Sequence, residues 1–292
     1  MPPRHSPTAR QRRLGTELRR LRERAGLSTV AASASLGIDR AKLSGIEAGR
    51  VGVSDERLRA MACHYDCADQ GLVDALAALN ADRGRRWWDE YRGVLPTGLL
   101  DLVELEYHAT ELVTAQTSHL PGLLHTIDHA RVVFQQAVPP LPPHEVEHRL
   151  SHRIKRQEIF HRASPTPYTA IIHEAALRME FGGPAVAQAQ LEHLASASER
   201  DHVTVLVIPF KAGAFPGSGQ SFVYAHGPVG ELDTVHLDQS HGPALIDAEA
   251  PLEKYRLLLD RMREVALDPT GSRGFIRSVA DSLRQGKPDA HS

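Results

Sequence analysis

Residues 26–50, GLSTVAASASLGIDRAKLSGIEAGR, predict two short helices joined by a tight turn. Ser28 and Asp39 are residue types that cap helix N-termini, and each stands directly before a run with helical spacing. Gly37, between the two runs, can adopt the positive φ of a tight turn at no steric cost. Gly49 can end the second run in the same way. The stretch therefore predicts a helix, a sharp turn and a second helix.

Three more helices are expected around this pair. Residues 9–26 carry leucines at i, i+4 and i+7 among arginines, which is typical of an amphipathic helix. Helical patterns follow at residues 54–65, with Ser54 as the expected N-cap, and at residues 68–84. The side chains expected to face the core are Leu14, Leu18, Leu21, Leu43, Ile46, Leu58, Met61 and Ala62. The first 82 residues therefore predict an all-α unit of five helices.

The charge of the chain is unevenly distributed. Residues 1–60 hold thirteen Lys and Arg against six Asp and Glu, a net charge of +7, whereas the whole chain has a formal net charge of −2. A basic head on an acidic body favours a polyanion-binding module joined to a second unit of another kind. A solvated basic helix face is the alternative explanation of the same charges.

The two-helix stretch resembles the Cro/phage-repressor (XRE-type) helix-turn-helix. The matching positions, which need no gap, are Leu27, Leu36-Gly37-Ile38, Leu43-Ser44, Ile46-Glu47 and Gly49. The resemblance implies that the helix after Asp39 enters the major groove of double-stranded DNA, and that a homodimer binds a pseudo-palindromic operator. A helical bundle without a nucleic-acid function is the alternative.

The same resemblance assigns roles to single residues. Arg40 and Ala41 stand where the family reads bases, and Arg40 can donate two hydrogen bonds to guanine O6 and N7. Thr29 stands where the family often has a glutamine that braces the DNA backbone, and nearby basic side chains are expected at phosphates. The predicted DNA-contacting set is Arg13, Ser28, Thr29, Arg40, Ala41, Lys42, Ser44, Gly45 and Arg50.

A second set of motifs runs through the rest of the chain. In order, they are Trp87-Trp88-Asp89, Leu120-Pro121-Gly122-Leu123-Leu124, Arg156-Gln157, Glu174-Ala175-Ala176-Leu177, Gln190-Leu191-Glu192-His193-Leu194, Val205-Leu206-Val207-Ile208-Pro209-Phe210 and Gly219-Gln220-Ser221-Phe222. They resemble the C-terminal domain of unknown function found in many XRE-type regulators of high-GC bacteria, a family also labelled antitoxin-like. The resemblance implies a dimerising, regulatory domain whose input is a small partner protein encoded nearby. A small-molecule ligand and a mainly partner-sequestering role are the alternatives.

Mixed helical and strand-like segments predict an α+β fold for residues 83–286, followed by a disordered tail at 287–292. The expected helices are residues 97–111, 126–137, 143–162, 185–198, 250–266 and 272–285. The expected strands are residues 168–173, 203–209, 220–226 and 232–238, in a small antiparallel sheet.

Catalytic and metal sites find weak support. GAFPGSGQ, residues 213–220, lacks both the Lys-Ser/Thr of a phosphate loop and the glycine spacing of a serine elbow, so it predicts a loop that enters a strand. His144, His148 and His152 recur at metal-binding spacing without an HExxH motif, which favours a solvated face. Glu174 is predicted to be a buried, hydrogen-bonded structural acid, with a pocket residue as the alternative. We expect no catalytic residues, metal or cofactor, and no enzyme activity.

Composition sets the remaining bounds. A chain of 292 residues favours two domains, and no apolar run approaches the roughly 20 residues of a membrane span. The opening MPPRHSPTARQRR lacks the apolar core of a secretory signal. Only Cys63 and Cys67 are available for disulfides. These features favour a cytoplasmic protein without a membrane partner.

Overall fold

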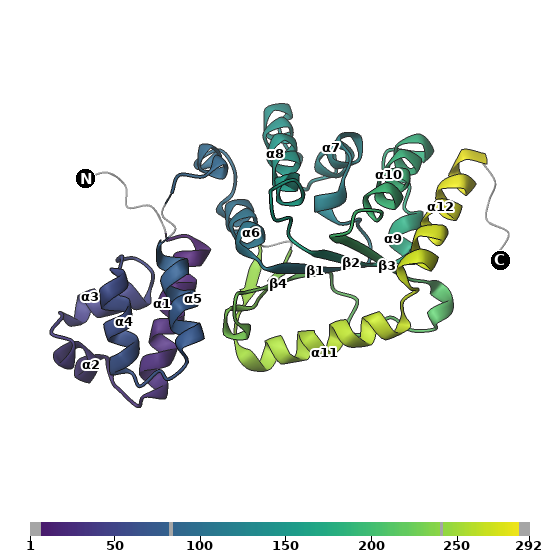
Figure 1. Cartoon of the computed structure of the whole chain (residues 1–292). Helices are drawn as coiled ribbons and strands as arrows, with labels where there is room; N and C mark the ends of the chain where they lie inside the picture. Colours follow the sequence, from purple (N-terminus) through teal and green to yellow (C-terminus); the bar gives the residue numbers. More distant parts are fainter. Residues whose placement is uncertain (1–6, 82–83, 240–241, 286–292) are drawn as a thin grey trace. The chain divides into compact units, whose positions relative to one another are not determined.

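Three helices of the first unit begin at side-chain caps that the sequence predicts. In this computed structural model, which describes residues 7–81, 84–239 and 242–285, Ser28, Asp39 and Ser54 each accept a hydrogen bond from a backbone amide of the following turn. Gly37 and Gly49 have φ of +61° and +69°. The predicted caps and both turns are therefore confirmed. The helices of this first unit are α1 (Ala9–Arg24), α2 (Thr29–Ser35), α3 (Arg40–Glu47), α4 (Asp55–His64) and α5 (Gln70–Ala81) (Figure 1).

The predicted apolar positions build the core of this unit. All of them are buried except Leu14, which is half-buried on α1. Helices α1 and α3 also approach each other closely, since a Cβ added at Gly15 would lie 2.5 Å from the backbone oxygen of Glu47. The close approach fixes the position of α3, the helix expected to enter DNA.

The second unit is built on one six-stranded sheet. Its strands are β1 (Glu111–Gln116), β2 (Tyr168–His173), β3 (Val203–Ile208), β4 (Phe222–His226), β5 (Thr234–Leu237) and β6 (Ala244–Ile246), and their spatial order is β3-β2-β1-β4-β5-β6. The four predicted strands are confirmed in place. Strands β1 and β6 were not predicted. The helix predicted at 97–111 ends earlier, at His108, and β1 begins at Glu111.

The predicted antiparallel sheet is wrong in its first half. Strand β1 pairs in parallel with β2, and β2 in parallel with β3, whereas β1–β4, β4–β5 and β5–β6 are antiparallel. Helical crossovers between β1 and β2 and between β2 and β3 bring each strand back in the same direction. The sheet is therefore mixed, and the unit is α+β as predicted.

Helices cover both faces and one edge of this sheet. Figure 1 shows α7, α8 and α10 on one side of the strands and α11 on the other. Helix α12 packs along α10 and closes the β3 edge, where the Val207 amide donates to Ser272 Oγ and its carbonyl accepts from Leu267. The helices are α6 (Thr97–His108), α7 (Ile127–Gln135), α8 (Pro143–Arg156), α9 (Glu174–Arg178), α10 (Pro184–Ala197), α11 (Glu249–Val265) and α12 (Pro269–Gln285), with 3-10 turns η1 (Trp87–Tyr91), η2 (Gly122–Leu124), η3 (Gln157–Phe160), η4 (Phe210–Ala212) and η5 (Gly230–Leu232).

The chain divides into two compact units near residue 90, with residues 101–105 grouped with the first unit. The boundary predicted at residues 82–83 and the tail predicted at 287–292 both lie outside the described residues.

Candidate nucleic-acid interface

A buried ion pair holds α3 against α1. Arg22 Nε and Nη2 lie 2.6 and 2.9 Å from Glu47 Oε1 and Oε2, and the two side chains are only 6% and 7% exposed. Arg22 Nη1 also donates to the Leu27 carbonyl at 2.7 Å, which ties the loop before α2 to the same guanidinium. Burial, with the nearby Glu47 carboxylate, raises the pKa of Tyr65 to about 12. The pair therefore joins α1, the loop before α2 and α3 in one rigid frame.

The first turn of α3 points into solvent. Arg40, Ala41 and Lys42 are exposed, while Leu43 is fully buried on the opposite side of the helix. Asp39 Oδ1 accepts hydrogen bonds from the Ala41 and Lys42 amides at 2.7 and 3.3 Å. Within the described part of the chain, no carboxylate forms an ion pair with Arg40 or Lys42. Both cations are thus available to a polyanion.

Three more predicted residues meet in one open depression. Ser28 and Thr29 at the start of α2 and Ser44 on α3 line it. The rest of the lining is Arg19, Arg22, Glu23, Glu47 and Ala48. Ser28 is exposed, and Thr29 and Ser44 are half-buried. The depression thus brings the start of α2 next to the middle of α3.

Arg50 lies just beyond α3 and is exposed. Its amide donates to the Gly45 carbonyl at 2.8 Å, which fixes the backbone after the helix while the guanidinium stays in solvent. This is a suitable position for a phosphate contact.

Two residues of the predicted DNA-contacting set have little exposed surface. Gly45 is buried, because Val51 packs against it so closely that an added Cβ would lie 2.6 Å from Val51 Cγ2. Arg13 has a side chain only 10% exposed, with Nε 3.1 Å from Oε1 of the buried Glu17. Gly45 therefore shapes the turn after α3, and Arg13 packs within the unit.

The structure adds one residue that the sequence reasoning did not select. Val30 on α2 is 57% exposed, because the short helix buries Ala32 and Ser33 instead. The helical spacing could have predicted this exposure, since residue 30 lies next to Thr29 on the outer side of the helix. An exposed valine there offers apolar contact to a thymine methyl group.

The second unit does not assemble the candidate catalytic residues into a site. Glu174 is 6% exposed and accepts hydrogen bonds from the Phe210 amide and Arg178, both at 2.7 Å, which is the predicted structural role. Residues 213–221 form a loop into β4, as predicted. His144 and His148 are exposed, as predicted for a solvated face, with ring centroids 6.4 Å apart. The prediction is wrong for His152, which is buried. Across residues 7–81, 84–239 and 242–285, no three His, Cys, Asp or Glu side chains group as metal ligands.

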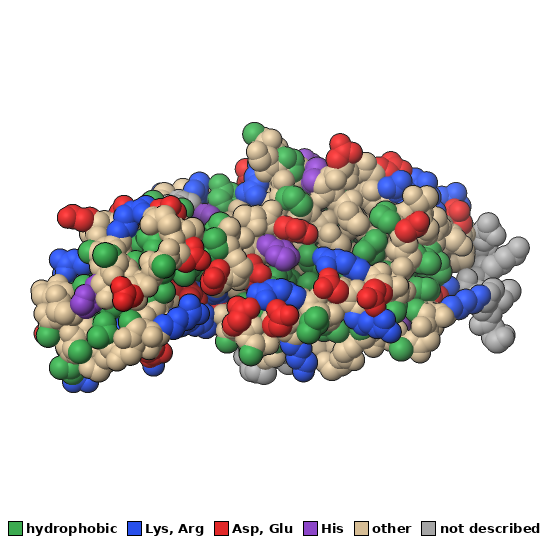
Figure 2. Space-filling model, turned by 60° about the horizontal axis from the view of Figure 1, so that its bottom comes forward, with side chains coloured by type: hydrophobic (Ala, Val, Ile, Leu, Met, Phe, Trp, Pro, Cys, Tyr) green, Lys and Arg blue, Asp and Glu red, His purple; other side chains and the backbone are tan. Residues whose placement is uncertain are grey.

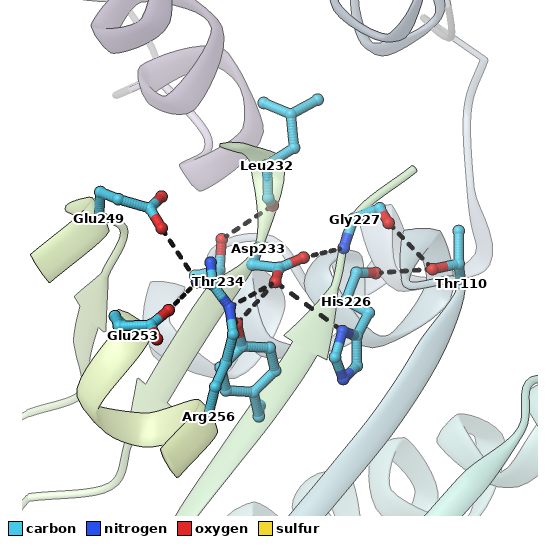
Figure 3. Close-up of polar contacts among 10 residues, drawn as sticks. Thr110, His226, Gly227, Leu232, Asp233, Thr234, Glu249, Glu253 and Arg256 are labelled. Carbon is cyan, nitrogen blue, oxygen red and sulfur yellow. Dashed lines mark hydrogen bonds and ion pairs between the residues drawn. The ribbon is translucent and has the colours of Figure 1, made fainter. Parts of the chain in front are cut away.

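A polar network anchors α11 to the sheet (Figure 3). Asp233, only 4% exposed, accepts hydrogen bonds from the Tyr224 hydroxyl at 2.6 Å and from the Gly227 amide at 3.0 Å. Arg256 on α11 donates from Nε to the Tyr224 hydroxyl at 2.9 Å. Tyr224 is fully buried, and its burial, followed by the hydrogen bond to Asp233, raises its pKa. The network is therefore a structural clamp.

Substitution Asp233→Ala is expected to destabilise the second unit by about 1–3 kcal/mol, because the Gly227 amide loses its acceptor and Tyr224 loses one of its two partners. The free energy of unfolding from urea titration measures the effect. Glu253→Ala is the matched control, since Glu253 contacts the same Arg256 but is 58% exposed, and it should cost no more than about 1 kcal/mol. Equal effects of the two substitutions would contradict the clamp.

The outer face of α11 carries both signs of charge. Figure 2 shows acidic and basic side chains interspersed over this helix. They include the ion pairs Arg256–Glu249, Arg261–Glu264 and Arg263–Asp260. This face of α11 therefore lacks the basic stripe that is typical of nucleic-acid-binding surfaces.

Comparison with protein families agrees with this division. Residues 13–76 match the family described as a helix-turn-helix domain, and residues 99–278 match a domain of unknown function, DUF5753. Comparison with curated proteins and with solved structures gives no match. None of the described helices has the length and apolar character that a membrane span requires. Because the second match covers well over half of the chain, the protein belongs to the DUF5753 family and carries a helix-turn-helix DNA-binding domain ahead of that domain.

Proposed function

We propose that the protein is a sequence-specific transcriptional regulator of the XRE type. The main support for this function is the first turn of α3. There, Arg40 and Lys42 are exposed on a helix that the Arg22–Glu47 pair fixes to α1. A rigid frame with a projecting helix N-terminus suits insertion into the major groove. The match of residues 13–76 to helix-turn-helix domains supports the same reading.

The proposal includes a homodimer on a pseudo-palindromic operator. Each chain offers one helix of the α3 kind, and such modules bind half-sites about one helical turn, roughly 34–36 Å, apart. The second unit would supply the dimer contact and the regulatory input. A small partner protein encoded nearby is our first choice for that input, and a small-molecule ligand is the second.

An antitoxin-like role is the alternative function. In that case the second unit would sequester a partner protein, and DNA binding would serve autoregulation. Neither version assigns an enzyme activity, and we propose none. Affinity capture of the full chain from its native host separates them, because sequestration requires a stoichiometric partner together with weak promoter binding.

Substitution Arg40→Ala is expected to relax sequence preference, with a loss of about 1–3 kcal/mol at the preferred site and little loss at other sites. Lys42→Ala should instead weaken binding evenly across sequences and reduce the slope of log affinity against log salt by about 1. Binding-site selection from random DNA, followed by titration at several salt concentrations, measures both effects.

Arg59→Ala is the matched control for these two variants. It removes the same charge from the same unit, but Arg59 is already paired with Asp55 and Asp74 at 3.2 and 2.7 Å. Its sequence preference should equal that of the wild type. If Arg40→Ala kept the full preference as well, Arg40 would be removed from the reading set.

A further inference from the structure

We propose that Arg153, with His129 and His119, forms an anion-binding site in the second unit that takes the carboxylate or phosphate group of a small molecule. The site goes beyond the proposed function, which assigns no residue of the second unit, and it can be tested without DNA. Its core lies between α7 and α8, on the face of the sheet that Figure 1 shows covered by these helices.

Two arginines of α8 differ in their partners. Arg156 directs its Nε and Nη2 to Glu106, at 2.8 and 2.6 Å, in a buried bidentate pair with exposed fractions of 6% and 2%. Arg153 lies three residues earlier on the same helix. Among the described residues, no carboxylate forms an ion pair with Arg153, and none accepts from its Nε or Nη2. The edge that Arg156 uses for a carboxylate is therefore vacant in Arg153.

The rest of the Arg153 guanidinium is held in place. Its Cζ lies 4.4 Å from the centroid of the Phe134 ring, and a Cβ added at Gly122 would lie 3.6 Å from Cζ and Nη1. Nη1 is hydrogen-bonded to His125 Nδ1 at 3.0 Å. The bond at Nη1 leaves the Nε–Nη2 edge without a partner among the described residues, and Nε itself is shielded from solvent. This edge matches the two oxygens of a carboxylate or phosphate.

His125 acts as the positioning residue of the site. An arginine can only donate, so the Nδ1 that contacts it must be the acceptor and the proton must be on Nε2. Nε2 then donates to the Leu120 carbonyl at 2.9 Å. Burial, followed by Arg153, lowers the pKa of His125 well below its usual value, so the ring stays neutral. The histidine thus fixes the guanidinium without neutralising its charge.

His129 is an indication of a bound ligand that is independent of Arg153. The ring is 1% exposed, and neither nitrogen has a hydrogen-bond partner among the described residues. It contacts the rings of His125 and Phe181 with centroids 4.6 and 5.5 Å apart. Buried polar atoms are normally satisfied, and a neutral imidazole has one donor and one acceptor to offer. A bound anion would accept from the donor.

His119 extends the cluster toward solvent. It follows the carboxyl end of β1, is exposed, and stacks on Phe181 with ring centroids 5.1 Å apart. Strand β1 has its parallel neighbour β2 on one side and the antiparallel β4 on the other. Carboxyl ends of strands where the strand order reverses are the usual ligand positions of open α/β sheets. The placement of the cluster agrees with a binding site.

The charges select an anion over a cation. Burial, followed by the neighbouring Arg156, lowers the pKa of Arg153 to about 9, which still leaves it charged at neutral pH. Asp238 and Glu106 act on Arg153 only at longer range, without an ion pair. Arg153 is half-buried, with its Nε shielded from solvent. A cation in this position without a close counter-ion is costly, and a bound carboxylate or phosphate would relieve that cost.

The test uses the full chain with inorganic phosphate and acetate as probes, each compared with sodium chloride at equal ionic strength. Phosphate or acetate is expected to raise the melting temperature by roughly 5–10 °C at a hundredfold excess over its Kd. The probe that acts identifies the group, phosphoryl or carboxylate. Spectra of ¹⁵N-labelled histidine rings should show the His129 nitrogens shifting during the same titration. A failure of both probes to exceed chloride, with His129 unmoved, would overturn the site.

Variants separate the site from general ion effects. Arg153→Met should weaken probe binding about thirtyfold or more, while Arg149→Met, which removes a charge paired with Glu145 on the same helix, should leave it unchanged. His129→Phe removes two unpaired buried nitrogens, so it should fold and still bind more weakly. If folded Arg153→Met kept the wild-type response, the proposal would be wrong. If Arg153→Met did not fold, His129→Phe and the wild-type ring spectra would decide. The result does not depend on DNA binding by the first unit, because the test uses no DNA.

Discussion

Substitution Glu47→Ala is expected to destabilise the first unit by about 3–5 kcal/mol. The substitution leaves the Arg22 guanidinium buried at 6% exposure without its carboxylate, and the hydrogen bond to Glu47 is the main cause of the raised pKa of Arg22. Single units of this size have a total stability of about 5–15 kcal/mol, so the loss is a large part of the whole. Hydrogen exchange of peptides from residues 9–81 measures it without interference from the second unit.

A control substitution and a double variant test whether the unpaired charge of Arg22 causes the loss of stability. Glu23→Ala is the control: Glu23 also lies 3.6 Å from Arg22 Nη2, but it is 49% exposed and hydrogen-bonds the exposed Arg19 instead, so at most about 1 kcal/mol should be lost. Arg22→Met with Glu47→Leu should recover most of the stability, since apolar side chains of similar size can replace a buried pair. A double variant as unstable as Glu47→Ala would mean that the packing, and not the unpaired charge, causes the loss.

The same substitution should abolish operator binding at the growth temperature of the host. Arg22 also donates to the Leu27 carbonyl, so the pair fixes the loop before α2 as well as α3. A recognition helix can only be inserted productively when its frame is rigid. The double variant should therefore regain operator binding along with stability, which separates folding from direct contact with DNA.

Local chemistry made the first unit predictable. Caps at Ser28, Asp39 and Ser54 and the positive φ of Gly37 depend on residues within three or four positions, and all are found as predicted. The burial of Gly45 was not predicted, because the packing of Val51 against it depends on the turn after α3. The Arg22–Glu47 pair joins residues 25 positions apart and leaves no periodic signal.

The sheet of the second unit was harder to predict for physical reasons. Strand β1 has four consecutive buried residues, so the alternation that marks a half-exposed strand is absent. Strand β6 has three residues, which is too short for a pattern. Parallel pairing depends on crossovers that bring distant segments together, and no local pattern encodes their direction. The candidate anion site was missed for the same reason, since His119, His129 and Arg153 come from three separate segments.

Buried histidines should make the second unit sensitive to acid. Burial, followed by Arg153 and His119, lowers the pKa of His129 to about 4, and burial, followed by Arg156, Arg153 and Lys155, lowers the pKa of His152 to about 3. The unfolded chain titrates near pH 6.5, so it binds more protons than the folded chain below that pH. Stability is therefore fully present above pH 6.5 and is lost as the pH falls toward 4 and then 3.

The expected loss from His129 alone is about 3 kcal/mol between pH 7 and pH 4, with a slope of at most about 1.4 kcal/mol per pH unit. Urea unfolding of the second unit at a series of pH values in phosphate-free buffer measures it. His129→Phe should flatten the curve in this window, because the variant has no proton to bind there. His148→Gln, at an exposed position of α8, should leave the slope unchanged. If the free energy of unfolding depended on pH in the same way in the wild type and in His129→Phe, the prediction would be wrong. The folded protein would then protonate His129 as easily as the unfolded chain does, because water or an anion already pairs with the ring.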